Sequence, residues 1–145
     1  MTTIIQNRKA NFEYHVLDRY TAGIQLMGTE VKSIKEAKAS ISEAYCHIIN
    51  GEVFLMGMHV SKYKQIMHTD HEPVRERKLL LNKKEIEKLQ KALNEKGLTI
   101  IPLAIKLSDS GFIKIEIGVA KGKKSFDKRN SIKEKDLKRE LGNNQ

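Results

Sequence analysis

One stretch of the sequence decides the fold class: Ile101-Pro102-Leu103-Ala104-Ile105-Lys106-Leu107-Ser108-Asp109-Ser110-Gly111-Phe112-Ile113-Lys114-Ile115-Glu116-Ile117-Gly118-Val119. Apolar side chains occupy every second position on both sides of Asp109-Ser110-Gly111, and this period of two is the spacing of a strand with one buried face. A short polar segment with glycine between two such runs predicts an antiparallel hairpin. Pro102 has no N–H to donate to a sheet ladder, so we expect it at a strand edge or a bulge.

The segments before this hairpin predict a second hairpin and a helix. Apolar and aromatic runs between residues 42 and 58 flank Asn50-Gly51, which suits the positive backbone angles of a type I′ turn. Asn82 followed by Glu85 forms a capping box, which starts a helix, and Gly97 suits the left-handed backbone that ends one. We therefore expect a hairpin centred on residue 50 and a helix that begins after Asn82.

The N-terminal half gives shorter patterns. Phe12, Tyr14 and Val16 alternate as in a half-buried strand. Residues 29–38 carry apolar side chains at spacings of three with a basic edge, which predicts a short helix. Residues 61–77 have no usable period, so we expect a long surface loop there.

Length and charge indicate one folded domain and a basic tail. A chain of 145 residues with 39% hydrophobic residues can build one modest core. The formal net charge is +9, and nine basic against four acidic residues place +5 of it in the last 25 positions. We expect a domain of residues 1–124 and a tail of residues 125–145 that is disordered alone and becomes helical when bound.

Several classes of protein are disfavoured. No apolar run is long enough to span a membrane, and the start of the chain lacks the features of a secretory signal, so we expect a cytoplasmic protein. Cys46 is the only cysteine, which excludes an internal disulfide and favours a small buried apolar role. No histidine or acidic cluster has metal-ligand spacing, and no nucleophile or carboxylate pair stands out. A non-enzymatic protein without metal or cofactor is therefore the preferred hypothesis, and an enzyme is the weaker one.

The basic residues are grouped beside the boundaries of the predicted elements. The groups are Asn7-Arg8-Lys9, Lys32-Ser33-Ile34-Lys35, Arg75-Glu76-Arg77-Lys78 and Lys121-Gly122-Lys123-Lys124. Such edges could converge on one face that binds the phosphate backbone of folded RNA, because few exposed aromatic residues are available for stacking single-stranded bases. A structural ribosomal protein would carry the same basic pattern and stays open as an alternative.

Several short sequence motifs then indicate a known family. They are Asn7-Arg8-Lys9-Ala10, Ala22-Gly23-Ile24, Gly28-Thr29-Glu30-Val31-Lys32-Ser33, Arg77-Lys78-Leu79-Leu80-Leu81, Gly97-Leu98-Thr99, Ala120-Lys121-Gly122-Lys123-Lys124 and Asp127-Lys128-Arg129. These motifs occur in the same order as in the small protein B family, whose members are also called SsrA-binding proteins, and the sequence resembles this family. The resemblance covers the chain from residue 7 to about residue 139.

The resemblance implies a fold and a function. The fold is mainly β, a small closed antiparallel barrel of the oligonucleotide-binding type with flanking short helices. The function is binding of the tRNA-like domain of transfer-messenger RNA and its delivery to stalled ribosomes, with the tail in the empty messenger channel. The partners are the RNA, the ribosome and, through the RNA, elongation factor Tu, for a protein expected to be a monomer. A general ribosome-associated basic RNA-binding protein is the alternative.

The motifs also carry over candidate residues. Those for the RNA face are Asn7, Arg8, Gly23, Glu30, Lys32, Lys78, Leu80, Lys121, Lys123 and Lys124, and those for the ribosomal decoding centre are Asp127, Lys128 and Arg129. Gly23 and Leu80 could instead serve backbone geometry or packing, and Glu30 could orient a neighbouring Lys or Arg. Thr21 stands where many members of the family carry an acidic residue, so it is assigned no RNA contact.

Overall fold

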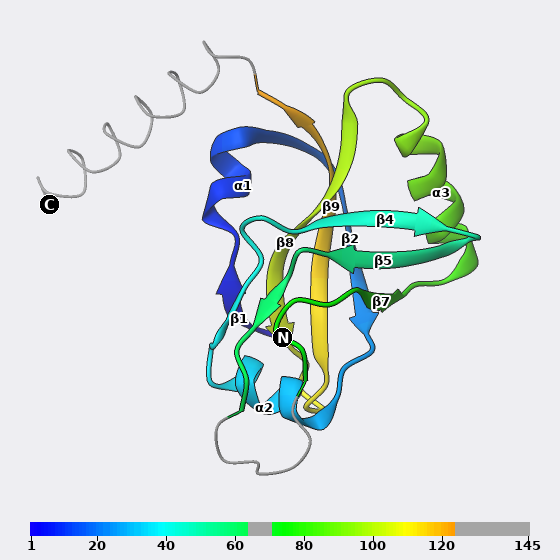
Figure 1. Ribbon diagram of the computed structural model, residues 1–145. Coiled ribbons are helices and arrows are strands. Elements are labelled where there is room, and N and C mark those ends of the chain that lie inside the picture. The colour runs from blue at the N-terminus through cyan, green and yellow to red at the C-terminus, as the bar shows by residue number, and fades with distance from the viewer. Residues whose placement is uncertain (64–70, 124–145) are drawn as a thin grey trace, which may run out of the picture.

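The computed structural model describes residues 1–63 and 71–123, which form a mainly β protein with three short helices (Figure 1). In chain order the elements are β1 (Thr2–Gln6), α1 (Arg8–Glu13), β2 (Tyr14–Ile24), α2 (Gly28–Lys35), β3 (Ala39–Ser40), β4 (Tyr45–Ile49), β5 (Glu52–Met56), β6 (His59–Val60), β7 (Arg77–Leu80), α3 (Lys83–Leu93), β8 (Leu98–Leu107) and β9 (Ile113–Gly122). Seven of the strands make one antiparallel sheet in the order β1-β8-β9-β2-β7-β5-β4, and β3 pairs with β6 separately.

The large sheet is open, so the prediction of a closed barrel is wrong. The sheet curls over itself until β4 and β8 come into contact, and Figure 1 shows β4, β5 and β7 lying across β8, β9 and β2. A strand can form two ladders, and β8 already forms them with β1 and β9. β1 pairs only with residues 104–107 of β8, and no ladder among the described residues joins β4 to β8, so β1 and β4 are the edge strands of this sheet.

Both predicted hairpins are confirmed. Asn50 and Gly51 join β4 to β5 with φ values of 51° and 75°, the two positive angles of a type I′ turn. β8 pairs with β9 along nearly their whole length, with an irregular register between Pro102 and Ala104. Pro102 thus lies at a bulge, as its missing N–H predicts.

The helices are confirmed in part. Asn82 caps α3, and the Asn82 and Glu85 side chains each accept the other's backbone N–H, as a capping box requires. α2 ends at Lys35, earlier than predicted, because Ala37 adopts a positive φ of 60°. The predicted strand at residues 12–16 is wrong at Phe12 and Glu13, which belong to α1, since the Asn7 side chain caps that helix and β2 begins only at Tyr14.

The core lies on the concave face of the sheet. Ile100, Ile105, Ile115 and Ile117 from β8 and β9 are fully buried there, and α2 and α3 contribute Ile34 and Leu89 to the same cluster. Cys46 is buried as expected, and its burial raises the pKa of the thiol to about 12.

A second, smaller cluster forms where α1 packs on the sheet. It joins Ala10 of α1 to Ile101, Leu103 and Ala120. This packing fixes the position of α1, and with it the first of the four basic groups.

Among the described helices, none is long and apolar enough to cross a membrane. The residues from 71 to 76 contain no helix or strand, and Val74 makes a single bridge to His59, so the predicted loop is confirmed there. It is wrong at Arg77, which begins β7, and His71 is buried rather than on the surface. The predicted tail of residues 125–145 lies outside the described residues.

Candidate nucleic-acid interface

The first and last of the basic groups meet at one end of β2. Tyr14 and His15, at the start of β2, pair with Gly122 and Lys121 of β9. The backbone N–H of Lys123 donates to the carbonyl of Glu13 at 2.8 Å, and its Nζ donates to the carbonyl of Asn11 at 2.8 Å. Figure 1 shows α1 and the end of β9 together at this end of the molecule. Arg8, Lys121 and Lys123 therefore form one basic region, which we call the α1 region.

The buried side chain of Asn7 holds the α1 region together by hydrogen bonds. Its side chain is buried, and its Nδ2 donates to the carbonyl of Pro102 at 2.8 Å and to that of Ile41 at 3.3 Å. Its Oδ1 accepts the N–H of Ala10 at 3.2 Å, which caps α1. The amide thus joins the helix to the β8 bulge, and it places the exposed Arg8 at the start of the helix.

The other two basic groups meet at the opposite end of β2. Gly23 and Ile24 pair with Leu80 and Leu79 of β7, and the N–H of Gln25 donates to the carbonyl of Lys78 at 3.0 Å. The Lys78 Nζ donates to a carboxylate oxygen of Glu52 at 3.1 Å. This end of β2, with β7 and α2, is called the α2 region below.

Gly23 and Leu80 are adjacent on the outer face of this region. A Cβ atom added to Gly23 would lie 3.2 Å from the Cβ of Leu80, which is tighter than usual packing. Leu80 is 48% exposed although its neighbour Leu79 is buried. Gly23 thus leaves room for an exposed apolar side chain between basic ones, which suits both proposed roles, contact with a partner and local packing.

Lys32 is exposed on α2, and its Nζ lies 5.3 Å from the centre of the Tyr63 ring. This is within the range of a cation–π contact, which limits the freedom of the lysine side chain without neutralising its charge.

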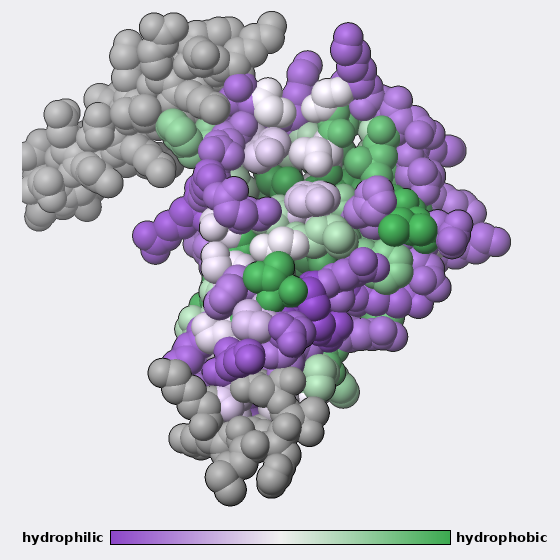
Figure 2. Space-filling view, in the orientation of Figure 1, coloured by the Kyte–Doolittle hydropathy of each residue, from purple (hydrophilic) through white to green (hydrophobic). Residues whose placement is uncertain are grey.

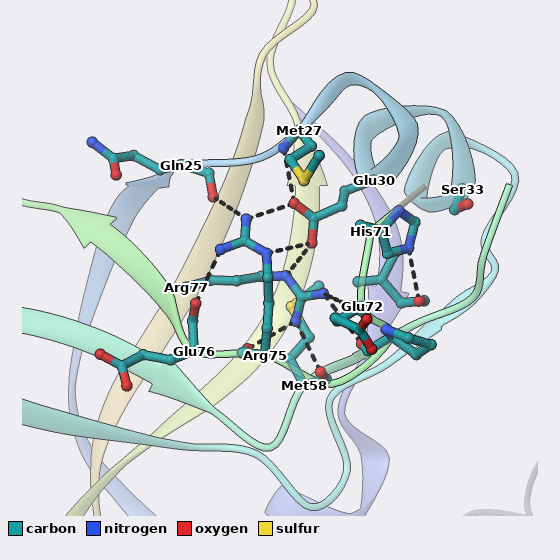
Figure 3. A network of polar contacts seen from close by, with 12 residues as sticks. Gln25, Met27, Glu30, Ser33, Met58, His71, Glu72, Arg75, Glu76 and Arg77 are labelled. Atoms are coloured by element: carbon teal, nitrogen blue, oxygen red, sulfur yellow. Dashed lines mark hydrogen bonds and ion pairs between the residues drawn. The ribbon is translucent and has the colours of Figure 1, made fainter. Parts of the chain in front are cut away.

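Glu30 lies at the centre of the α2 region and is completely buried (Figure 3). Its Oε1 accepts the N–H of Met27 at 2.8 Å and Nη2 of Arg75 at 2.6 Å. Its Oε2 accepts Nε of Arg75 at 3.2 Å and Nε of Arg77 at 2.5 Å. These four hydrogen bonds saturate the carboxylate, so Glu30 orients two arginines. This is the second of the two roles that the sequence left open for Glu30, the first being contact with RNA.

Arg77 is as deeply buried as Glu30. Its two terminal nitrogens donate to four backbone carbonyls, those of Met58, Glu72, Pro73 and Arg75. Three of these carbonyls, those of Glu72, Pro73 and Arg75, belong to the segment before β7, so Arg77 shapes the chain that carries Arg75.

The charges explain the ionisation state of this network. Burial by itself would raise the pKa of Glu30, but the hydrogen bonds from Arg75, Met27 and Arg77 outweigh it, and the pKa is lowered from its ordinary value. Burial also lowers the pKa of Arg77, and the Glu30 carboxylate opposes this change. Glu30 is therefore ionised at neutral pH and is paired with two cations.

The structure thus joins the four basic groups in two pairs at the two ends of β2. At about 3.3 Å per residue, the 11 residues of β2 separate the regions by roughly 30 Å. Sequence reasoning placed Arg75 and Arg77 in a basic group but missed their contact with Glu30, because the pattern does not show that residues 45 and 47 positions apart meet. Lys124, Asp127, Lys128 and Arg129 lie outside the described residues.

Figure 2 shows hydrophilic side chains along the margins of the face in view and an apolar area toward its centre. In the described part of the chain no group of three or more metal-binding side chains occurs. Fold and surface together define a small antiparallel β protein with basic residues gathered at both ends of one long strand.

The sequence matches the SmpB protein family over residues 4–145, and the chain belongs to this family. It is 53% identical over 140 residues to the SsrA-binding protein of Acholeplasma laidlawii, covering 97% of this chain and 93% of that protein. It is 50% identical over 137 residues to the SsrA-binding protein of Christiangramia forsetii, covering 94% of this chain and 87% of that protein.

A solved structure shares the fold. It is described as "tmRNA-SmpB: a journey to the center of the bacterial ribosome" and superposes with a TM-score of 0.72 at 36% sequence identity. The alignment covers 86% of this chain and 87% of the other.

Proposed function

We propose that this protein binds the tRNA-like domain of transfer-messenger RNA and is required for the delivery of that RNA to stalled ribosomes. Membership of the SmpB family, relatives named SsrA-binding proteins and the structural similarity to an SmpB chain support the proposal. The observation that carries it is the pair of basic regions held at the two ends of β2.

Two such regions suit a folded RNA better than a single strand. A rigid strand keeps the α1 and α2 regions roughly 30 Å apart, which is about one turn of a nucleic-acid helix. A structured RNA can present phosphates at a fixed separation, so both regions can be occupied together. Recognition then depends on the shape of the RNA as well as on its charge.

The candidate residues divide by exposure. RNA can reach seven of them, which are at least partly exposed: Arg8, Gly23, Lys32, Lys78, Leu80, Lys121 and Lys123. Lys124 follows directly in the sequence. Asn7 and Glu30 are buried, so their contribution is to hold α1 and the arginines in place.

We propose a separate role for residues 125–145. This basic tail enters the empty messenger channel of the stalled ribosome, where Asp127, Lys128 and Arg129 contact the decoding centre. A segment of this composition can become ordered on a phosphate-lined surface. The protein acts as a cytoplasmic monomer, and elongation factor Tu joins the complex through the RNA.

A truncation after Lys124 tests this division of labour. The shortened protein should bind transfer-messenger RNA with an affinity within about threefold of the full chain, since both basic regions remain, but it should not support tagging of nascent chains on stalled ribosomes. Binding is measured by gel shift and tagging in a reconstituted translation system. Equal loss in both assays would contradict separate roles, and full tagging activity would exclude the tail from the ribosomal step.

A further inference from the structure

We infer that Arg75 is an RNA-phosphate contact in the α2 region and that Glu30 is the positioning residue that presents it. This inference rests on the proposed function and deepens it, because it adds a contact residue and assigns Glu30 an indirect role. It follows from the charges, the exposure and the geometry of the network in Figure 3.

The charges in the network do not cancel. Arg75 and Arg77 are both within ion-pair distance of the single carboxylate of Glu30, at 2.6 and 2.5 Å. One positive charge therefore remains uncompensated within the network. Such a charge is costly to keep in a dry interior, so it is best placed where it can reach water or an anion.

Exposure shows which arginine carries this charge. The side chains of Glu30 and Arg77 are completely buried, whereas that of Arg75 is 32% exposed. All five N–H groups of Arg77 donate to Glu30 or to backbone carbonyls. The remaining charge of the network thus reaches the surface through Arg75.

The geometry of Arg75 leaves it prepared for one more acceptor. Nε and Nη2 bind both oxygens of Glu30 in a fork, and Nη2 also donates to the carbonyl of Gln25 at 3.4 Å. Nη1 donates once, to the carbonyl of Glu76 at 3.0 Å. Among the described residues its second hydrogen has no acceptor, so an oxygen of a phosphate group can take it without breaking an existing bond.

The surroundings favour an anion at this position. Lys78 and Lys32 lie on the two elements next to the network, β7 and α2. Two acidic residues belong to the same segment: Glu76 points away from the two guanidinium groups in Figure 3, and Glu72 lies beside the buried Arg77. A guanidinium held in place loses little side-chain entropy on binding, and this makes it a better phosphate ligand than a free surface lysine.

Binding to the tRNA-like domain, measured by fluorescence anisotropy over a range of KCl concentrations, tests the role of Arg75. Arg75→Gln should weaken binding about tenfold and reduce the slope of log affinity against log salt by about 0.9, the value for one lost phosphate contact. Arg19→Gln is the matched control, because this substitution removes the same charge. Arg19 is an exposed arginine that also pairs with a glutamate, Glu116, at 2.7 Å. It should change affinity less than twofold.

A second measurement does not depend on a variant that folds. Phenylglyoxal modifies arginines, and mass spectrometry of the wild-type protein should show that bound RNA protects Arg75 but leaves Arg19 as reactive as before. An unchanged affinity and salt slope in Arg75→Gln, or modification of Arg75 that RNA does not reduce, would overturn the inference. Failure of the wild-type protein to bind the RNA would instead overturn the proposed function.

Non-additivity tests the positioning role of Glu30. Glu30→Gln should weaken RNA binding, and Arg75→Gln should then cause much less further loss than it causes in the wild-type protein, because Arg75 is no longer held. Full additivity of the two effects would show that Glu30 does not act through Arg75.

Discussion

At the scale of single residues, the two buried side chains among the candidates have a common property. Asn7 and Glu30 both use their polar atoms to join a helix to a distant part of the sheet. The side chains that such a residue positions are close to it in space but distant in sequence. Exposed candidates such as Arg8 and Lys32 can be recognised from charge, whereas the purpose of a buried one depends on its partners.

The lowered pKa of Glu30 predicts how the free energy of unfolding depends on pH in acid. Folding lowers the pKa of Glu30 from its ordinary value of 4.5, so the pairing of the ionised carboxylate stabilises the protein fully at a pH well above 4.5. This contribution declines as the pH falls through 4.5, and it is lost at a pH below the lowered pKa of the folded state. Wild type should therefore exceed Glu30→Gln in free energy of unfolding at pH 7 by a margin that shrinks as the pH falls below 4.5.

Urea unfolding at a series of pH values measures this margin. Glu87→Gln is the control, since Glu87 is exposed on α3, and it should stay within about 0.5 kcal/mol of wild type throughout. A margin for Glu30→Gln that is constant with pH would show that the ionised carboxylate does not stabilise the fold.

At the scale of elements, the attachment of α1 decides the shape of the α1 region. α1 has only six residues and is too short to be stable alone, so its position depends on the Asn7 side chain and on Ala10 in the small cluster. Asn7→Ala would remove the cap and leave the carbonyl of Pro102 without this donor.

We expect Asn7→Ala to lower the free energy of unfolding by about 1–3 kcal/mol, from the lost cap and the buried carbonyl. Asn11→Ala is the control, because Asn11 is exposed on the same helix. Thermal and urea unfolding of the two variants give the comparison. Equal stability of both would mean that the Asn7 amide does not hold α1 to the sheet.

The same scale shows how far the sequence could predict the structure. The hairpins and the start of α3 depend on local signals, such as the alternation from Ile101 to Val119, Asn50-Gly51 and the Asn82 cap, and these predictions are confirmed. The assignment of Phe12 to a strand failed because the competing signal, the Asn7 cap, lies five residues away. Closure of the sheet depends on whether β4 pairs with β8, which is distant from it in the chain, and no local pattern determines that.

At the scale of the whole molecule, the long strand β2 turns four separate basic groups into two regions with a fixed spacing. The sequence identified the groups and the family, but it could not show their pairing, because each pairing joins elements distant in the chain. The proposed selection of one folded RNA over another rests on this rigid pair of regions, because a diffuse net charge of +9 cannot provide it.

The most direct test is the binding of the full-length protein to the tRNA-like domain of transfer-messenger RNA and to an ordinary tRNA, measured in salt high enough to suppress non-specific attraction to phosphate. We predict at least a tenfold preference for the tRNA-like domain, since shape as well as charge should determine affinity. Equal affinity for the two RNAs, or loss of both at the same salt concentration, would contradict the proposal and would favour a general ribosome-associated basic protein.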